Sequence, residues 1–233
     1  MLALGPRARK RKMRRDQYIP RVEHPFPFPH PAPFPFPHAL SLHPTLSRVA
    51  SALSTHVPTP APRDEPFHEA AVALVLLPSE QGLEALFIKR ATRDGDPWSG
   101  QIALPGGRRN VGEASLELTA IRETFEEIGL DLAVEGELLG ELSELRPRTP
   151  VLPPVIVRPY VFAVRDRPTL VLSDEVADAF WVPLRDVFDL ERKQEIDVHF
   201  SNFHMRRPAI GVGEHVIWGM TESILRTFED LWR

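Results

Sequence analysis

The stretch from Ala103 to Leu130 constrains the fold most strongly, because it joins a glycine turn, a short polar loop and a periodic helix pattern. Apolar residues recur there at steps of three and four, which predicts one buried helical stripe made of Ala114, Leu118, Ile121, Phe125 and Ile128. Gly129 follows this stripe, and glycine favours the left-handed conformation that ends a helix. The pattern therefore predicts a helix that packs on a core along one side and ends at Gly129.

Three glutamates gather on the other side of this predicted helix. At about 100° per residue, Glu123, Glu126 and Glu127 fall within roughly 100° of arc, opposite the apolar stripe. Like charges three or four positions apart destabilise a helix by about 0.2 to 0.5 kcal/mol per pair, whereas a shared cation would reverse that sign. Mg²⁺ and Mn²⁺ prefer hard oxygen ligands, so the cluster indicates a site for one of these ions. An ordinary solvated acidic face is the alternative interpretation.

A glycine turn, Pro105–Gly106–Gly107, comes shortly before the helix. Because Gly106 and Gly107 carry no side chains, the backbone there can approach a metal ion or a substrate closely and offer carbonyl and amide groups. Arg122 lies at the edge of the acidic face, where it is able to hold one carboxylate by a bidentate pair. Each feature is common alone, and their combination indicates a catalytic element.

Gly107, Glu113 and the run from Arg122 to Leu130 closely resemble the Nudix box. That motif is a glycine, five residues, a glutamate, seven residues and then Arg-Glu-aliphatic-x-Glu-Glu-x-Gly-aliphatic. Two positions depart from it: eight residues separate Glu113 from Arg122, and Thr124 replaces an aliphatic residue. The extra residue falls at the junction of loop and helix, where a change of length is tolerated better than within a helix.

This resemblance implies a fold and an activity. The expected fold is α/β, an α/β/α sandwich with a mixed central sheet over residues 65–233. The expected activity is hydrolysis of a nucleoside diphosphate linked to another group, with Mg²⁺ or Mn²⁺ activating the attacking water.

The resemblance also implies roles for particular residues. Glu123 and Glu127 would be the main metal ligands, Glu126 would share a second ion, and Gly107 would offer its backbone to the site. Arg122 would orient a glutamate, and either Glu126 or Glu175 would take the proton from water.

Residues around the box look like those of the coenzyme A pyrophosphatase branch of Nudix enzymes, namely Gly100–Gly107 and Glu175–Leu184. This implies that coenzyme A or its esters are split into adenosine 3′,5′-bisphosphate and a phosphopantetheine. The upstream segment of that branch, Leu-Leu-Thr-x-x-Ser-x-x-basic, is matched only in part, since Ala91 stands near the serine position and Asp96 at the basic one. ADP-ribose or another dinucleotide is the alternative substrate. A Nudix fold that binds a nucleotide without cleaving it is the alternative class.

Three further residues are candidates for the site. Trp98 precedes the glycine turn and is suited either to stack on a base or to cap the core. Arg90 would hold a substrate phosphate or lie exposed. Glu175 stands before a predicted strand, where it can turn toward the site, or it is the first-turn acid of a helix capped by Ser173.

Residues 1–64 are predicted to be a mostly disordered extension. Arg7–Arg15 is a basic run, read as a solvated tail or alternatively as a nucleic-acid arm or a targeting segment. Residues 24–38 alternate with proline and are unsuited to a helix or a sheet. A short helix is plausible near residues 45–55, before the linker Pro58–Pro62.

Charge and composition exclude several classes of function. Residues 1–15 hold seven Lys or Arg and no acid, so the rest of the chain carries a formal charge of −11, against −4 for the whole chain. An acidic globular part argues against general nucleic-acid binding. The chain has no cysteine and no apolar run near the roughly 18 residues of a membrane span. We expect a cytoplasmic enzyme for a small nucleotide substrate, and whether it forms a homodimer stays open.

The remaining elements follow from apolar patterning. Strands are predicted over Ala70–Leu77, Leu83–Lys89, Leu138–Leu145, Val155–Val164, Ala179–Pro183 and Val216–Met220, and a final amphipathic helix over Thr221–Leu231. His199, His204 and His215 lack metal-ligand spacing and are read as surface or core histidines.

Overall fold

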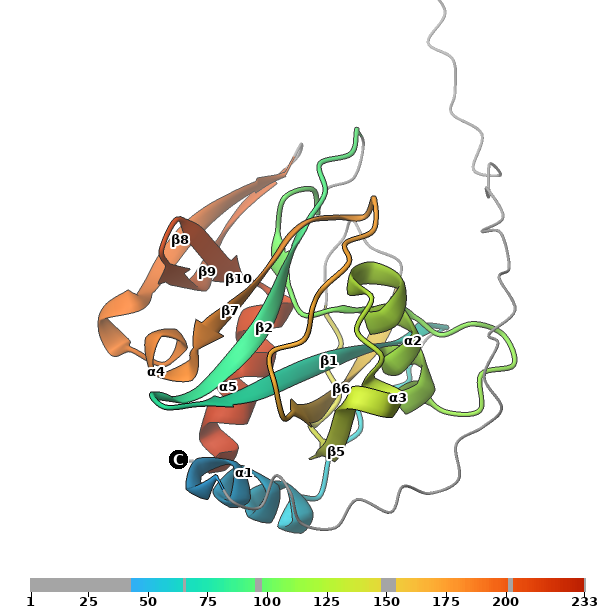
Figure 1. Cartoon of the computed structure of the whole chain (residues 1–233). Helices are drawn as coiled ribbons and strands as arrows, with labels where there is room; N and C mark the ends of the chain where they lie inside the picture. Colours follow the sequence, from blue (N-terminus) through green and yellow to red (C-terminus); the bar gives the residue numbers. More distant parts are fainter. Residues whose placement is uncertain (1–42, 65, 95–97, 148–153, 201–202, 233) are drawn as a thin grey trace, which may run out of the picture. The chain divides into compact units, whose positions relative to one another are not determined.

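A computed structural model of the chain describes residues 43–64, 66–94, 98–147, 154–200 and 203–232, and within these ranges a seven-stranded mixed sheet forms the centre of the fold (Figure 1). The strand order is β3-β2-β1-β6-β5, with β4 beside β1 and β7 beside β2. The bounds are β1 (His68–Ser79), β2 (Gly82–Arg90), β3 (Ile102–Ala103), β4 (Gly106–Arg108), β5 (Gly136–Glu141), β6 (Val155–Val164) and β7 (Val176–Pro183). β1 runs parallel to β6 and antiparallel to β2, so the sheet is mixed as predicted.

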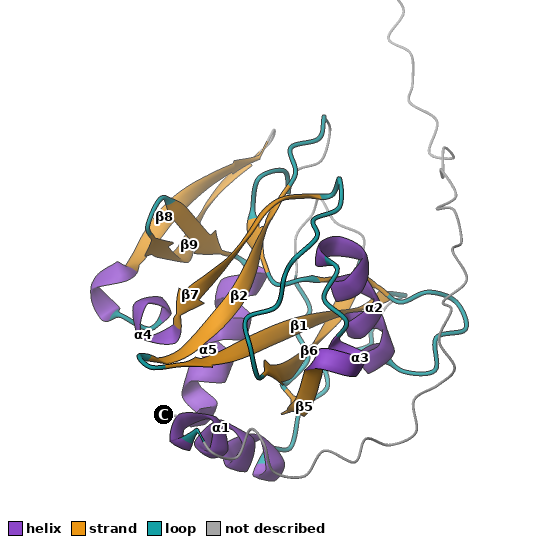
Figure 2. Cartoon of the chain, in the orientation of Figure 1, coloured by secondary structure: helices purple, strands orange, loops and turns teal. Residues whose placement is uncertain are grey.

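Strand β1 is buried on both faces, as its continuous apolar run predicts. Ala70, Val72 and Leu74 belong to one core cluster, and Ala71 and Ala73 belong to the other. The first cluster includes residues of α1 (Pro44–Thr55) and α5 (Met220–Trp232), and the second includes residues of α2 (Leu116–Ile128) and α3 (Leu132–Glu135). Helices therefore cover both faces of the sheet (Figure 2), which confirms the predicted α/β/α sandwich.

Helix α1 precedes the sheet in the chain and packs against it. It starts at Pro44, where the fixed backbone angle of proline suits the first turn of a helix. Leu46, Val49 and Leu53 are buried in the core cluster that also contains α5 residues. Helix α1 thus packs on the sheet, at the place where a short helix was expected near residues 45–55. The predictions for residues 1–42 and for Asp96 fall outside the described residues.

The sheet opens where the glycine turn lies. β1 and β2 pair only next to their hairpin, from Leu76↔Ala85 to Ser79↔Gly82. Beyond that point β2 pairs with β3, and β1 pairs with β4. The chain crosses from β3 to β4 through Pro105, whose carbonyl accepts a hydrogen bond of 2.8 Å from the Ala73 amide. The glycine turn is consequently held inside the sheet by backbone pairing.

A second sheet was predicted only in part. It has three strands in the order β10-β9-β8 within the described residues, with β8 at Lys193–Phe200, β9 at Phe203–Val212 and β10 at His215–Trp218. Of these only β10 was expected, because charged residues such as Glu195, Asp197 and Arg206 obscure the apolar alternation of β8 and β9. The short helix α4 (Leu184–Val187) and the 3₁₀ turn η2 (Leu190–Arg192) connect it to β7.

Most of the other predicted strands and helices are confirmed. Four strands and the final helix are confirmed by β1, β2, β6, β7 and α5, each within a few residues of its expected bounds. The strand predicted over Leu138–Leu145 ends earlier, since β5 stops at Glu141 and Leu145 keeps a single bridge to Val157. Among the described residues, none of the helices is both long and apolar enough to cross a membrane.

Candidate active site

Helix α2 ends at Gly129 as expected, but it buries a different face from the predicted one. The Ser115 hydroxyl accepts the Leu118 amide at 3.2 Å, and Gly129 adopts a φ of 71° and donates to the Phe125 carbonyl. The prediction of a buried helical position is wrong for two residues of the stripe. Phe125 is 43% exposed, and Ala114 is exposed and precedes the helix. The helix packs on the sheet through Leu116, Ala120, Ile121 and Ile128, and the neighbouring arc, which holds Glu123 and Glu127, packs on the glycine turn.

Two of the three helix glutamates are buried against the glycine turn. Glu123 is 3% exposed and Glu127 is 5% exposed, so these carboxylates are not a solvated face. The Gly106 amide donates to Glu127 Oε2 at 2.9 Å. A β-carbon on Gly107 would lie 2.5 Å from the carboxyl carbon of Glu123, which no real side chain tolerates. Gly106 and Gly107 thus allow both carboxylates to approach the backbone.

Arg122 is the centre of the ion-pair network rather than an edge cation. Its side chain is 5% exposed and donates to Glu113, to Glu123 at 2.8 Å and to Glu126 at 3.0 Å. It also donates to the Arg108 carbonyl at 2.9 Å, on the strand that carries the glycines. Burial alone would lower the pKa of Arg122, but its bonds and charge interactions with Glu113 and Glu123 raise it. Arg122 therefore stays charged and fixes the orientation of its partners.

Glu113 joins this network despite the extra residue before Arg122. Its carboxylate accepts the Thr119 hydroxyl at 2.7 Å and the Asn110 amide at 2.8 Å. Burial alone would raise the pKa of Glu113, yet the bonds from Arg122, Thr119 and Asn110 hold it below the ordinary value. The loop absorbs the additional residue, and Glu113 contacts Arg122.

Thr124, the second departure from the motif, is fully buried. Its hydroxyl donates to the Ala120 carbonyl at 2.7 Å, one helical turn earlier. A buried hydroxyl with a partner costs little, so threonine replaces an aliphatic residue here without leaving an unpaired polar group.

Burial and several nearby charges act on the Glu127 carboxylate. Burial raises the pKa of Glu127 to about 8, against the hydrogen bond from Gly106. The negative charges of Glu123 and Glu175 raise it as well, and the positive charge of Arg90 lowers it. Arg90, at the end of β2, and Glu175, before β7, therefore lie within electrostatic reach of Glu127.

Glu175 is placed by a segment whose role the sequence did not reveal. The Val171 amide donates to the Ile128 carbonyl and the Ser173 amide to the Glu127 carbonyl, each at 2.9 Å, so residues 171–173 are fastened to the last turn of α2. Glu175 follows this segment and forms an ion pair of 3.4 Å with Arg93. The alternative of a helix capped by Ser173 is wrong, because β7 begins at Val176. These contacts are backbone bonds, which leave no signal in the side chains.

Of the remaining candidates, Trp98 is half-buried and Glu126 is exposed. The Trp98 carbonyl accepts the Gln101 amide at 3.2 Å, in the loop that joins β2 to β3. The side chain of Glu126 is 44% exposed. His199 lies beside His204 across β8 and β9 with ring centroids 5.9 Å apart, and His215 stacks on Phe180 with ring centroids 4.3 Å apart.

Comparison with known proteins decides the family. Residues 66–202 match the sequence model of the NUDIX domain. The chain belongs to the Nudix family. An uncharacterized Nudix hydrolase of Yersinia enterocolitica, NudL, is 30% identical over 183 residues, which cover 78% of this chain and 90% of that protein. The Nudix domain and these hydrolase relatives make the chain a Nudix hydrolase.

Two further matches are more limited. An uncharacterized protein of Schizosaccharomyces pombe is 38% identical over 120 residues, which cover 50% of this chain and only 36% of that relative. A solved MutT/nudix family protein from Enterococcus faecalis is 21% identical, with a TM-score of 0.48 over 79% of this chain and 68% of its own.

Proposed function

We propose that this Nudix hydrolase cleaves the diphosphate bond of a nucleoside diphosphate linked to a second group, with Mg²⁺ or Mn²⁺ held by Glu123 and Glu127. The observation that supports this proposal is the burial of both carboxylates against the backbone of Gly106 and Gly107. Buried carboxylates are costly unless a cation or hydrogen bonds compensate them. A site that gathers them beside an open backbone suits a cation shared with a substrate.

The donor set fits such an ion. Within the described residues no group of three or more His, Cys, Asp or Glu is spaced to hold a metal. Mg²⁺, however, is commonly bound by one or two carboxylates together with substrate phosphate oxygens and water. Glu123 and Glu127 supply two hard carboxylates, and the Gly107 backbone offers a third oxygen. When bound there, the cation would neutralise the diphosphate and lower the pKa of a water molecule.

The protein groups have separate tasks in this proposal. Arg122 orients Glu123, and Glu113 in turn holds the guanidinium of Arg122. Arg90 carries a positive charge near Glu127, where it would balance a substrate phosphate. Glu126 would contribute to a second ion only by opening its bond to Arg122.

The proton acceptor is Glu126 or Glu175 in this proposal. Glu175 lies in a loop, is within reach of the Glu127 charge and forms an ion pair with exposed Arg93. Glu126 is the more exposed of the helix glutamates. Replacing Glu126 and Glu175 by glutamine, one at a time, distinguishes the two candidates. Loss of the base lowers kcat while the affinity for Mn²⁺ stays unchanged.

Coenzyme A or its esters are the first candidate substrate, with adenosine 3′,5′-bisphosphate and a phosphopantetheine as products. The residues that support this choice are Gly100–Gly107 and Glu175–Leu184, which resemble the coenzyme A pyrophosphatase branch. ADP-ribose or another dinucleotide is the second candidate, and the departures at Ala91 and Asp96 favour it.

One panel of substrates tests these proposals. Purified protein with Mg²⁺ or Mn²⁺ is offered coenzyme A, ADP-ribose, NADH and diadenosine polyphosphates, and the products are separated by chromatography. We expect coenzyme A to give the highest kcat/KM. Preference for ADP-ribose would replace the first candidate by the second, and absence of cleavage for every compound would support a nucleotide-binding sensor instead.

A further inference from the structure

A second recess lies on the other side of the β2–β3 ribbon from helix α2. It is an open groove of ≈ 560 Å³ between β3 and the small sheet of β8, β9 and β10. Ile102 at its floor belongs to the core cluster that includes α5 residues, whereas α2 packs in the other cluster. The groove therefore opens on the face of the sheet that is opposite Glu123 and Glu127.

Backbone hydrogen bonds separate this groove from the catalytic carboxylates. The Arg90 amide donates to the Gln101 carbonyl at 3.0 Å, and the Gly100 amide donates to the Arg90 carbonyl at 3.1 Å. Lys89 lines the groove, while its neighbour Arg90 acts on Glu127. The side chains of Lys89 and Arg90 thus lie on opposite faces of the sheet, as the alternation of side chains along a strand requires.

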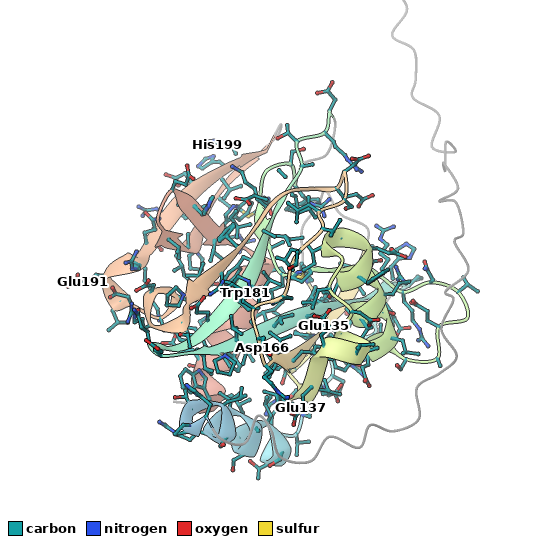
Figure 3. All side chains as sticks on the ribbon, viewed as in Figure 1. Glu135, Glu137, Asp166, Trp181, Glu191 and His199 are labelled. Atoms are coloured by element: carbon teal, nitrogen blue, oxygen red, sulfur yellow. The ribbon has the colours of Figure 1, made fainter. Side chains whose placement is uncertain are left out.

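The lining of the groove combines positive charge with aromatic surface. Lys89 is half-buried and forms no ion pair with any residue in the described part of the chain. His199, near the end of β8 (Figure 3), and His215 add imidazole donors, and Trp218 adds a large aromatic surface. Glu214 is the acid of the lining and is exposed.

His215 is held rigidly at its position. Its ring stacks on Phe180 at 4.3 Å between centroids, and Phe180 stacks on Phe87 at 6.2 Å. Phe87 is fully buried, so the stack fastens the imidazole to the core. A side chain fixed in this way loses little conformational entropy when a ligand binds.

We propose that this groove is a second binding site, for a small compound in which a flat ring carries a phosphate group, such as a nucleoside monophosphate. Its volume falls within the range of roughly 300 to 1,000 Å³ that is typical of small-molecule sites. Lys89 would pair with the phosphate, and Trp218 and His215 would contact the ring. The proposal is independent of the hydrolytic function, because the groove does not include the glutamates of α2.

Binding of AMP to the full-length protein tests this proposal. Isothermal titration in EDTA removes divalent cations and prevents turnover, and adenosine and inorganic phosphate are titrated separately. We expect saturable AMP binding that Lys89→Met weakens about tenfold, since a charge-assisted hydrogen bond is lost. Glu214→Gln should tighten it, because a negative charge leaves the lining. Arg48→Met removes a positive charge from the exposed face of α1 and is the matched control, with no expected effect.

The catalytic site provides the second comparison. Glu127→Gln should bind AMP as well as the unchanged protein does, which would show that the ligand is not in the hydrolytic site. Lack of saturable binding would overturn the proposal. So would an equal loss in Lys89→Met and Arg48→Met, or a change of AMP affinity in either direction in Glu127→Gln.

Discussion

Gly107 and Glu123 occupy their positions together only because residue 107 has no side chain. A β-carbon there would lie 2.5 Å from the carboxyl carbon and 2.6 Å from both carboxyl oxygens of Glu123. Gly107 needs no unusual backbone angle, so the restriction is steric. The turn and the helix are fitted to one another at this contact.

Replacing Gly107 by alanine should therefore damage the site more than the fold. Glu123 must move, and a displacement of about 1 Å at a catalytic group costs on the order of 100-fold in rate. Overpacking should lower the free energy of unfolding by about 1 to 3 kcal/mol. Urea denaturation and kcat/KM with Mg²⁺ measure the two effects. Gly213→Asn, in an exposed left-handed turn with open space around it, is the control and should leave both nearly unchanged.

Removing the guanidinium of Arg122 should destabilise the protein strongly. Arg122→Met leaves Glu113 and Glu123 partly or fully buried without their cation, and breaking one side of a buried ion pair typically costs about 3 to 5 kcal/mol. Denaturant unfolding measures the loss. The double variant Glu113→Gln with Arg122→Met should recover part of it, since one uncompensated carboxylate is removed. Additive losses in the double variant would contradict this account of the network.

Glu144 should make stability depend on acid pH. Its side chain is 2% exposed and accepts bonds from Arg158 at 2.6 Å and from the Ala61 amide at 2.9 Å, and it pairs with Arg63. Burial alone would raise the pKa of Glu144, but these partners hold it below the ordinary value of 4.5.

The direction in which stability changes with pH follows from this lowered pKa of Glu144. The unfolded chain binds the proton more readily, so the stabilising contribution of Glu144 is present above its unfolded pKa and is lost as pH falls through the folded one. We expect Glu144→Gln to be less stable than the unchanged protein at neutral pH, with the difference shrinking at acid pH. Unfolding curves at both pH values measure it, and a constant difference would show that the carboxylate charge plays no part.

The parts of the fold that the sequence predicted are those with strong local patterns. Gly129 ends α2 as expected, and the apolar run of β1 is buried on both faces. The stripe assignment failed at Phe125, because α2 packs the side that holds Glu123 and Glu127 against the glycine turn and leaves an aromatic residue outside. Periodicity assumes that burial follows apolar character, and that assumption is weakest at a functional site.

Contacts made by backbone groups could not be predicted from the sequence. The fastening of residues 171–173 to the end of α2, and the insertion of the glycine turn between β1 and β2, both depend on amide and carbonyl groups that every residue carries. The groove beside Lys89 also depends on a second sheet whose strands β8 and β9 are too polar to show a strand pattern.

The central claim is that Glu123 and Glu127 hold the cation that drives diphosphate hydrolysis, and the rate of Mg²⁺-dependent cleavage in Glu127→Gln tests it most directly. Glutamine keeps the shape and can still accept the Gly106 amide, so the fold should survive, while turnover should fall at least about 100-fold. Glu135→Gln, at an exposed position of α3 (Figure 3), is the matched control and should retain full activity. Substantial cleavage by a folded Glu127→Gln protein would contradict the claim.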